Sequence, residues 1–224
     1  MFEYPDIGRI DTPDGRFYMA PGGTVPSVTT VLAASADMSW LAEWTTRVGD
    51  VEAERIREEA SSIGTAVHAR MEVGMRGQEQ PPCSILIRMM ADGLSRLMEG
   101  RLDDVWGIEA RLYCAGLYAG TCDLVGVWDG RPAIIDYKTG RAPKGTDAIA
   151  AYSKQCAAYA IAHDEMFGST IESCVILEVT RDMRTRATVF ADASLELAKM
   201  SWLSDLEAYY GRRGDNRFQE PHVG

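Results

Sequence analysis

The chain has 224 residues, of which 46% are hydrophobic and 25% charged, a balance typical of one ordinary globular domain. No apolar run approaches the roughly 20 residues that a membrane helix needs, so we expect no membrane partner. The formal net charge of −10 argues against a protein that coats nucleic acid through a broadly basic surface, but it is compatible with a local basic groove. The first residues have neither a secretory nor a mitochondrial targeting pattern, and we expect a cytoplasmic location.

The five cysteines are an odd number, and no two of them form a C-x-x-C pair. A disulfide framework, a zinc ribbon and a thiolate-held iron–sulfur cluster are therefore not expected. We interpret the cysteines as small buried side chains in a reducing compartment.

The N-terminal half predicts an arm followed by helices. Residues 1–26 are rich in Gly, Pro and Asp, which favours an irregular or hairpin-forming arm. Ser27, in the segment PSVTTVLAAS, is a suitable helix cap. Helical spacing of apolar residues then predicts four helices, over residues 38–49, 51–60, 63–73 and 84–99.

The C-terminal half predicts a sheet flanked by helices. Strands are expected over residues 106–113, 117–128, 131–138, 174–180 and 185–191, and helices over 147–167 and 194–212. This order indicates an α/β (α+β) fold, in which helices flank a central mixed sheet that contains an antiparallel meander. We interpret residues 1–224 as one domain, with an arm (1–26), a helical part (27–100) and a sheet core (101–224).

Two acidic residues are expected to meet in the meander. The Asp-Gly pair at 129–130 is typical of a two-residue type I′ hairpin turn, and the register that follows puts Asp123 directly opposite Asp136. Lys138 lies on the same strand face as Asp136, because side chains repeat every two residues. Two facing carboxylates repel unless a shared proton, Lys138 or a divalent cation offsets the charge. Converging carboxylates suit Mg²⁺ or Mn²⁺, and the lysine could stabilise a phosphoryl transition state or position the attacking water.

Two further polar pairs have helical spacing. His68 and Glu72 are four residues apart and share a helix face; a neutral His68 could be a third metal ligand, with Glu72 orienting its ring. Gln155 and Tyr159 are also four apart and could border the cleft and contact phosphate. The alternative for both pairs is an ordinary helix surface.

Five segments in order resemble a known family. GTAVH, GTCDLV, IIDYKTG and QCAAYA resemble the RecB-like nucleases of the PD-(D/E)XK superfamily. PSVTTVL is similar to the exonuclease branch that includes the mitochondrial genome maintenance exonuclease, and phages and bacteria carry similar enzymes. The resemblance covers roughly residues 26–160 and implies a restriction-endonuclease-like core with metal-dependent phosphodiesterase activity.

The resemblance also implies roles for particular residues. The metal ligands would be His68, Asp123, Asp136 and the carbonyl of Tyr137. Lys138 matches the catalytic lysine, whose role as a base or as an electrostatic stabiliser stays open. The residues expected to contact DNA are Gln155 and Tyr159, which match a Q-x-x-x-Y motif, and Ser27 and Thr29 at a helix N-terminus.

Glu109 matches a glutamate that is often found on the first core strand of the family. A two-residue turn at 115–116 would pair Asp123 with Ile108 and leave Glu109 on the other face. A three-residue loop over 115–117 would instead bring Glu109 opposite Asp123. Both registers fit the sequence, so the place of Glu109 stays open at this point.

Basic residues after two strands offer phosphate contacts despite the acidic pI of about 4.8. They are Lys138, Arg141, Lys144 and Lys154 in the first group, and Arg181, Arg184 and Arg186 in the second. Arg141 and Lys144 are expected to bind DNA. For the second group, scattered solubilising charge is an equal alternative.

We therefore expect a Mg²⁺- or Mn²⁺-dependent deoxyribonuclease. It would be an exonuclease that hydrolyses single-stranded or frayed DNA ends in recombination, repair or replication, together with a recombination or single-strand-binding protein. One alternative is a structure-specific endonuclease of the same fold. Another is a non-catalytic nucleic-acid-binding subunit, against which the opposed carboxylates argue.

Overall fold

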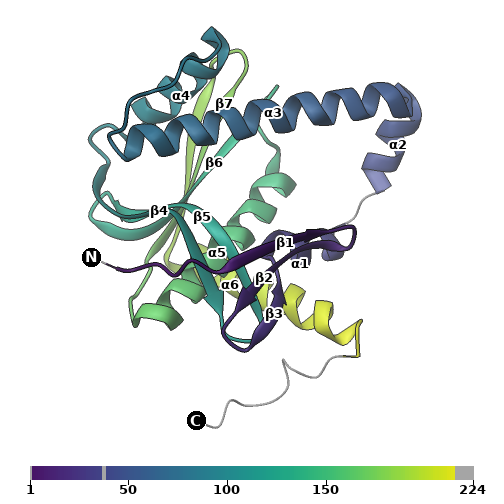
Figure 1. Cartoon of the computed structure of the whole chain (residues 1–224), viewed down its shortest axis with the longest axis vertical. Helices are drawn as coiled ribbons and strands as arrows, with labels where there is room; N and C mark the ends of the chain where they lie inside the picture. Colours follow the sequence, from purple (N-terminus) through teal and green to yellow (C-terminus); the bar gives the residue numbers. More distant parts are fainter. Residues whose placement is uncertain (1, 37–38, 215–224) are drawn as a thin grey trace.

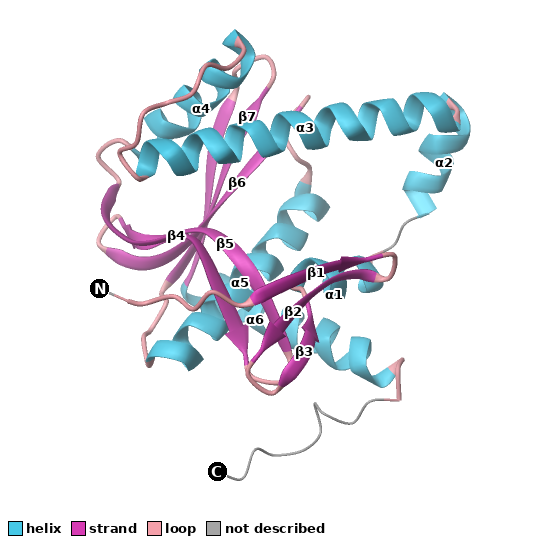
Figure 2. Cartoon of the chain, viewed as in Figure 1, coloured by secondary structure: helices cyan, strands magenta, loops and turns pink. Residues whose placement is uncertain are grey.

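A five-stranded mixed sheet forms the centre of the structure, a computed structural model that describes residues 2–36 and 39–214 (Figures 1 and 2). The strands are β4 (Leu102–Cys114), β5 (Tyr118–Trp128), β6 (Arg131–Gly140), β7 (Ser173–Thr180) and β8 (Thr185–Ala191), in that spatial order. All neighbours are antiparallel except β6 and β7, which are parallel. The predicted mixed sheet with an antiparallel meander is therefore confirmed.

Helices cover both faces of this sheet. They are α1 (Val28–Ser35), α2 (Ser39–Val48), α3 (Asp50–Met75), α4 (Ile85–Met98), α5 (Thr146–Phe167) and α6 (Asp192–Gly211). Leu124 and Ile135 pack toward α3 and α4, whereas their neighbours Val125 and Ile134 pack toward α5 and α6. This alternation follows from the two-residue period of a strand. None of the described helices combines the length and the apolar character needed to cross a bilayer.

The N-terminal arm folds into a second, small sheet. Its strands are β1 (Gly8–Thr12), β2 (Gly15–Ala20) and β3 (Gly23–Pro26), all antiparallel. Ser27 follows β3 directly and caps α1, with its Oγ accepting a hydrogen bond from the N–H of Thr30, as the sequence predicts. A bridge between Ser27 and Ala119 joins this small sheet to β5.

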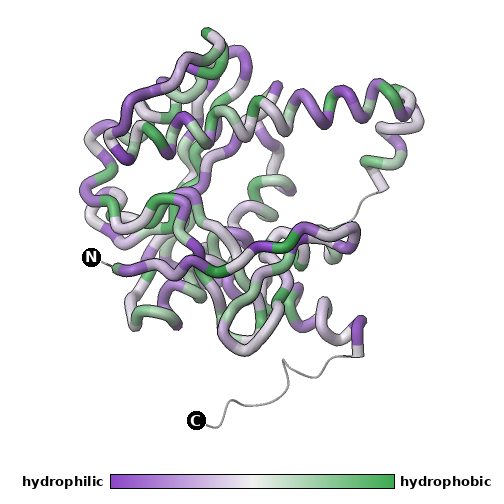
Figure 3. The backbone as a smooth tube through the Cα atoms, viewed as in Figure 1, coloured by the Kyte–Doolittle hydropathy of each residue, from purple (hydrophilic) through white to green (hydrophobic). Residues whose placement is uncertain are grey.

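Helix α3 differs from the prediction of two separate helices over 51–60 and 63–73. It runs continuously from residue 50 to residue 75, because the polar and small residues at its middle include no proline to interrupt the hydrogen bonds. Its first half is mostly exposed, and Figure 3 shows many hydrophilic residues along it. Residues 1, 37, 38 and 215–224, which fall in the predicted arm, helix and sheet core, lie outside the described residues.

The two hairpins of the meander set the register of the site. At the 129–130 turn both residues have positive φ angles, 48° and 77°, as a type I′ turn requires. Pairing then runs from the turn to Leu124 and Ile135, in the predicted register. In the preceding hairpin Cys114 pairs with Tyr118, so the three-residue loop is the one that forms.

His163 of α5 is fully buried under the N-terminal segment. Its Nε2 lies 3.0 Å from the hydroxyl of Tyr4 and its Nδ1 2.6 Å from the hydroxyl of Ser169, and Phe2 and Phe167 contact the ring. Burial lowers the pKa of His163 to about 4. The fold therefore requires the neutral imidazole.

We expect the protein to lose stability on acidification because of His163. The pKa of an unfolded histidine is about 6.5, so this contribution is complete above that pH and is lost as the pH falls toward 4. Between pH 7 and pH 5 the loss is about 1–2 kcal/mol. Denaturant unfolding at the two pH values should show a smaller difference for His163→Gln; an unchanged difference would contradict this role of His163.

Candidate active site and metal centre

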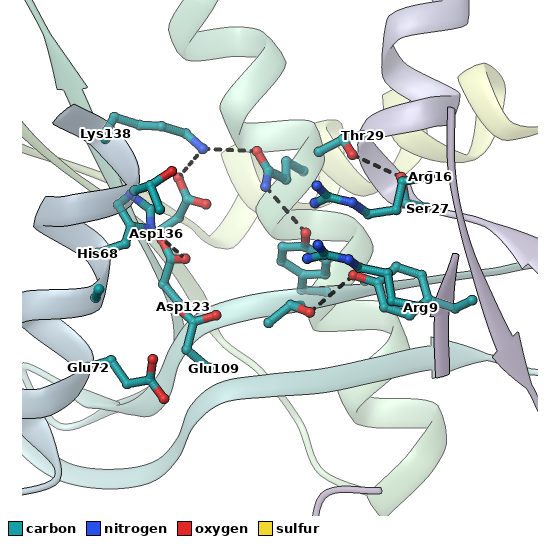
Figure 4. A pocket seen from close by; sticks show the side chains of 18 residues that line it. Arg9, Arg16, Ser27, Thr29, His68, Glu72, Glu109, Asp123, Asp136 and Lys138 are labelled. Atoms are coloured by element: carbon teal, nitrogen blue, oxygen red, sulfur yellow. Dashed lines mark hydrogen bonds and ion pairs between the residues drawn. The ribbon is translucent and has the colours of Figure 1, made fainter. Parts of the chain in front are cut away.

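A cavity of about 470 Å³ lies between α3, the central strands, α5 and the N-terminal sheet (Figure 4). It brings together residues that are far apart in the sequence. The residues expected at the site that line it are Ser27, Thr29, His68, Glu72, Glu109, Asp123, Asp136, Lys138, Gln155 and Tyr159. Arg141 and Lys144 are not among the lining residues.

His68 reaches the cavity from the second half of α3. Its Nδ1 lies 3.1 Å from Asp123 Oδ1, and its Nε2 lies 3.0 Å from the carbonyl oxygen of Tyr137. Burial lowers the pKa of His68, but the hydrogen bond and charge of Asp123 and the charge of Asp136 outweigh it, so the pKa is raised. Asp123 and Tyr137 thus fix the ring orientation.

Glu72 has a different partner from the one expected. It lines the cavity, but its Oε1 accepts a hydrogen bond from Arg76, at 3.1 Å. Both nitrogens of His68 already contact other groups. Among the described contacts, Asp123 and Tyr137 take the orienting place that was predicted for Glu72.

Asp123 lies where β5 and β6 separate. The last paired residues are Leu124 and Ile135, and beyond them Asp123 Oδ2 accepts a hydrogen bond of 2.7 Å from the N–H of Tyr137. The carboxylate therefore replaces a backbone carbonyl as the partner of that N–H group. This arrangement holds Asp123 rigidly while its other oxygen faces His68.

Glu109 lies across from Asp123, because the pairs Ile108–Leu124 and Ala110–Cys122 flank the two acids. Its φ angle is 49°, which is uncommon for a residue other than glycine and is found at strained functional positions. Burial, and next the charge of Asp123, raise the pKa of Glu109 to about 7. A nearby cation would therefore favour the ionised form of Glu109.

Asp136 and Lys138 form a buried ion pair beside these groups. The Lys138 Nζ and the Asp136 Oδ2 are 2.6 Å apart, and the two side chains are only 17% and 4% exposed. Burial raises the pKa of Asp136, with Lys138 opposing the shift. Burial also disfavours the charge of Lys138, but the negative charge of Asp136 outweighs this and raises the lysine pKa. Lys138 is therefore held in its protonated form.

Two polar residues of α5 extend the Asp136–Lys138 pair, and Figure 4 marks the contacts of Lys138 with dashed lines. Lys138 Nζ donates to Gln155 Oε1 at 3.1 Å, and Gln155 Nε2 donates to the Tyr159 hydroxyl at 3.3 Å. The spacing of four residues that drew attention to Gln155 and Tyr159 thus places both on the cavity face of α5. Through Gln155 they fix the direction of the ammonium group.

The donor set fits a divalent cation. One ligand atom from each of His68, Glu109 and Asp123 lies within 4.8 Å of the others, and the Tyr137 carbonyl is 3.0 Å from the His68 ring. Carboxylate and carbonyl oxygens are the ligands that Mg²⁺ and Mn²⁺ prefer. The carboxylate that converges with Asp123 in this cluster is Glu109. Asp136 lies beside it, and its buried Oδ2 has no hydrogen-bond partner among the described residues apart from the ion pair.

The basic residues expected to line a phosphate groove are largely paired elsewhere. Arg141 and Arg181 both pair with Glu59, and Lys154 pairs with Asp205. The remaining pairs of this kind are Arg184 with Asp182 and Arg186 with Glu178.

Two cations of the cavity wall, Arg9 and Arg16, were not anticipated from the sequence. The Pro-Asp-Gly turn between them is a recognisable hairpin signal. The register that follows from this turn predicts that both arginines lie on one face of the hairpin.

Gly120 gives a test of the packing under the site. A Cβ atom at this position would lie 2.6 Å from Cε1 of the buried Tyr159. We expect Gly120→Ala to push Tyr159 and Gln155 aside and to destabilise the fold by roughly 1–3 kcal/mol. Thermal unfolding of Gly120→Ala and of Gly211→Ala, where a Cβ meets nothing within 4 Å, checks this expectation; an equal loss of stability in the two variants would contradict it.

A comparison with protein families identifies the superfamily of the chain. The model of the PD-(D/E)XK nuclease superfamily matches residues 34–209, and the chain belongs to that superfamily. The resemblance inferred from the motifs is thereby confirmed at this level. Nucleases of this superfamily use divalent metal ions. No curated protein matches the chain.

Three solved structures, among others, are similar to the chain. The first is SSO0001, the second is a candidate exonuclease from Eubacterium rectale, and the third is the alkaline exonuclease LHK-Exo from Laribacter hongkongensis. In that order, the sequence identities are 14%, 13% and 16%, and the TM-scores are 0.43, 0.45 and 0.30. The alignments cover 82%, 68% and 66% of this chain, and 75%, 68% and 82% of the other chains.

Proposed function

We propose that the protein is a Mg²⁺- or Mn²⁺-dependent deoxyribonuclease that hydrolyses phosphodiester bonds at DNA ends. The observation that carries the proposal is the convergence of His68, Glu109 and Asp123 next to the Asp136–Lys138 ion pair. The membership in a nuclease superfamily supports the reaction class. The choice of an exonuclease rests on the PSVTTVL resemblance.

In this proposal the chain's own groups divide into ligands and charge-stabilising groups. Glu109, Asp123 and His68 hold the cation, with Asp136 and the Tyr137 carbonyl beside them as further ligands. When bound, the divalent ion polarises the phosphate, lowers the pKa of water and neutralises developing charge. His68 must give up its contact with Asp123 or with the Tyr137 carbonyl in order to ligate, and it must then be neutral.

Lys138 acts as an electrostatic stabiliser in this mechanism. Asp136 keeps it protonated, and a protonated lysine is a donor for the negative charge that develops on the phosphate oxygens. Gln155 and Tyr159 set its direction. Ser27 and Thr29, whose hydroxyls are 2.9 Å apart at the start of α1, contact the DNA backbone on the opposite wall.

Digestion of end-labelled DNA tests the proposal. Single-stranded, duplex and covalently closed circular DNA are incubated with Mg²⁺, with Mn²⁺ or with EDTA. An exonuclease degrades the linear substrates from their ends, leaves the circle intact and is inactive in EDTA. Cleavage of the circle would replace the exonuclease by an endonuclease of the same fold, and no cleavage of any substrate by a folded protein would overturn the proposed function.

A further inference from the structure

One face of the N-terminal hairpin carries two arginines. In the β1–β2 register Arg9 pairs with Tyr18, and Asp11 pairs with Arg16. Because side chains alternate along a strand, these four residues share one face. Arg9, Arg16 and Tyr18 line the cavity, and in Figure 4 the two arginines lie across it from His68, Asp123 and Asp136.

This hairpin face is fixed relative to the metal cluster. The Tyr18 hydroxyl lies 3.1 Å from the hydroxyl of Thr121, and Thr121 is two residues before Asp123 on β5. The backbone of Arg16 is tied to the start of α1, because its carbonyl accepts hydrogen bonds from the Ser27 N–H and from the Thr30 hydroxyl. The arginines therefore stand on a wall that is built into the site.

The two guanidinium groups keep donors for a ligand. Asp11 lies between them, 2.9 Å from Arg16 Nε and 3.0 Å from an Arg9 terminal nitrogen. Among the described contacts, the two terminal nitrogens of Arg16 and the second terminal nitrogen of Arg9 have no protein partner. The side chains are 42% and 49% exposed. Lys138, the remaining lysine or arginine of the cavity wall, is already paired with Asp136.

We propose that Arg9 and Arg16 bind backbone phosphates of the DNA strand next to the scissile bond. The N-terminal sheet is then the wall that holds the strand against the metal cluster. The inference rests on the proposed nuclease function and names how that site holds its substrate. A guanidinium matches a phosphate with two parallel N–H donors, and backbone phosphates carry no base sequence. The contact is therefore independent of DNA sequence.

Such a contact has a kinetic signature. A phosphate that flanks the scissile bond keeps its charge throughout the reaction, so the arginines bind ground state and transition state alike. Loss of uniform binding raises KM and leaves kcat unchanged. Removing one arginine–phosphate interaction also weakens the salt dependence of single-strand binding, by about 0.7 in the slope of log K against log salt.

The test measures binding of a fluorescent oligothymidylate by anisotropy across salt concentrations, in Ca²⁺ buffer. The variants are Arg9→Gln/Arg16→Gln and, as a matched control, Asp11→Asn. Both variants break the ion pairs of Asp11 with Arg9 and Arg16, but only the double arginine variant removes the positive charges. We expect the double variant to bind at least about tenfold more weakly, with a salt slope smaller by about 1.4, and Asp11→Asn to bind as tightly as wild type or more tightly.

Wild-type affinity and salt slope in the double variant would overturn the proposal, as would an equal loss in Asp11→Asn, which would mark the ion pairs as structural. Wild-type protein that binds no DNA would overturn it as well. The readout does not depend on hydrolysis. Arginine-dependent binding in Ca²⁺ buffer, together with no cleavage of any DNA substrate in Mg²⁺ or Mn²⁺, would therefore contradict the nuclease proposal and leave only the contact between the arginines and the phosphates standing.

Discussion

Replacing Asp123 with asparagine is expected to lower the rate of DNA hydrolysis by at least about 10³-fold, which corresponds to about 4 kcal/mol in the activation barrier. Among the described residues, Asp123 is the one carboxylate that contacts both His68 and the backbone of Tyr137. Its neutral amide would still accept the Tyr137 hydrogen bond, but it would remove the charge that a divalent ion needs. The loss should appear in kcat at saturating metal.

Asp92→Asn is the matched control for this variant, because Asp92 is exposed on α4 and does not line the cavity. It should keep wild-type activity. The free energy of unfolding of Asp123→Asn should stay within about 1 kcal/mol of wild type, because the change also relieves repulsion with Glu109. A folded Asp123→Asn protein with full metal-dependent activity would contradict the assignment of the metal centre.

Replacing Lys138 with methionine is expected to lower kcat by about 10²–10³-fold, as the loss of one preorganised donor does in other enzymes. It also leaves Asp136 buried without a counter-charge, which costs roughly 3 kcal/mol of stability when the carboxylate is ionised. Protonation of Asp136, whose pKa is already raised, relieves that cost. The stability loss should therefore be larger at pH 8 than at pH 5, as denaturant unfolding at both pH values can show.

Lys138→Arg separates the two roles that the sequence left open. If Lys138 contributes positive charge, arginine should keep more activity than methionine. If it were a general base, arginine would fail equally, because it does not lose its proton. Lys154→Met is the control for removing a cation near the site. Lys154 lies on α5 and pairs with Asp205 outside the cavity. Equal activity of the arginine and methionine variants would contradict the electrostatic role.

Local signals predicted the elements that carry the site. The turn at 129–130 fixed the β5–β6 register through Leu124 and Ile135. The spacing of Gln155 and Tyr159 put both on the cavity face of α5. The turn before β5 was ambiguous, because two- and three-residue loops both suit the segment around Gly116. The choice depends on packing across β4 and β5, which local sequence does not encode.

Other features depend on tertiary structure that no single segment shows. Arg9 and Arg16 belong to the cavity only because Tyr18 and Ser27 dock the small sheet on β5. The contact of His68 with Asp123, in place of the predicted contact with Glu72, likewise depends on where β5 and β6 separate. In each case the residue type was visible in the sequence, but its partner was set by another element.

Calorimetric titration of Mn²⁺ into wild-type protein and into Asp123→Asn is the sharpest test of the metal centre. We predict saturable binding by the wild type, and its loss in the variant, because His68, Glu109 and Asp123 form one ligand cluster. The same titration with a DNA oligonucleotide present covers a site that the substrate helps to complete. Equal binding by both proteins, or no binding by the wild type with or without DNA, would contradict a metal centre at this cavity.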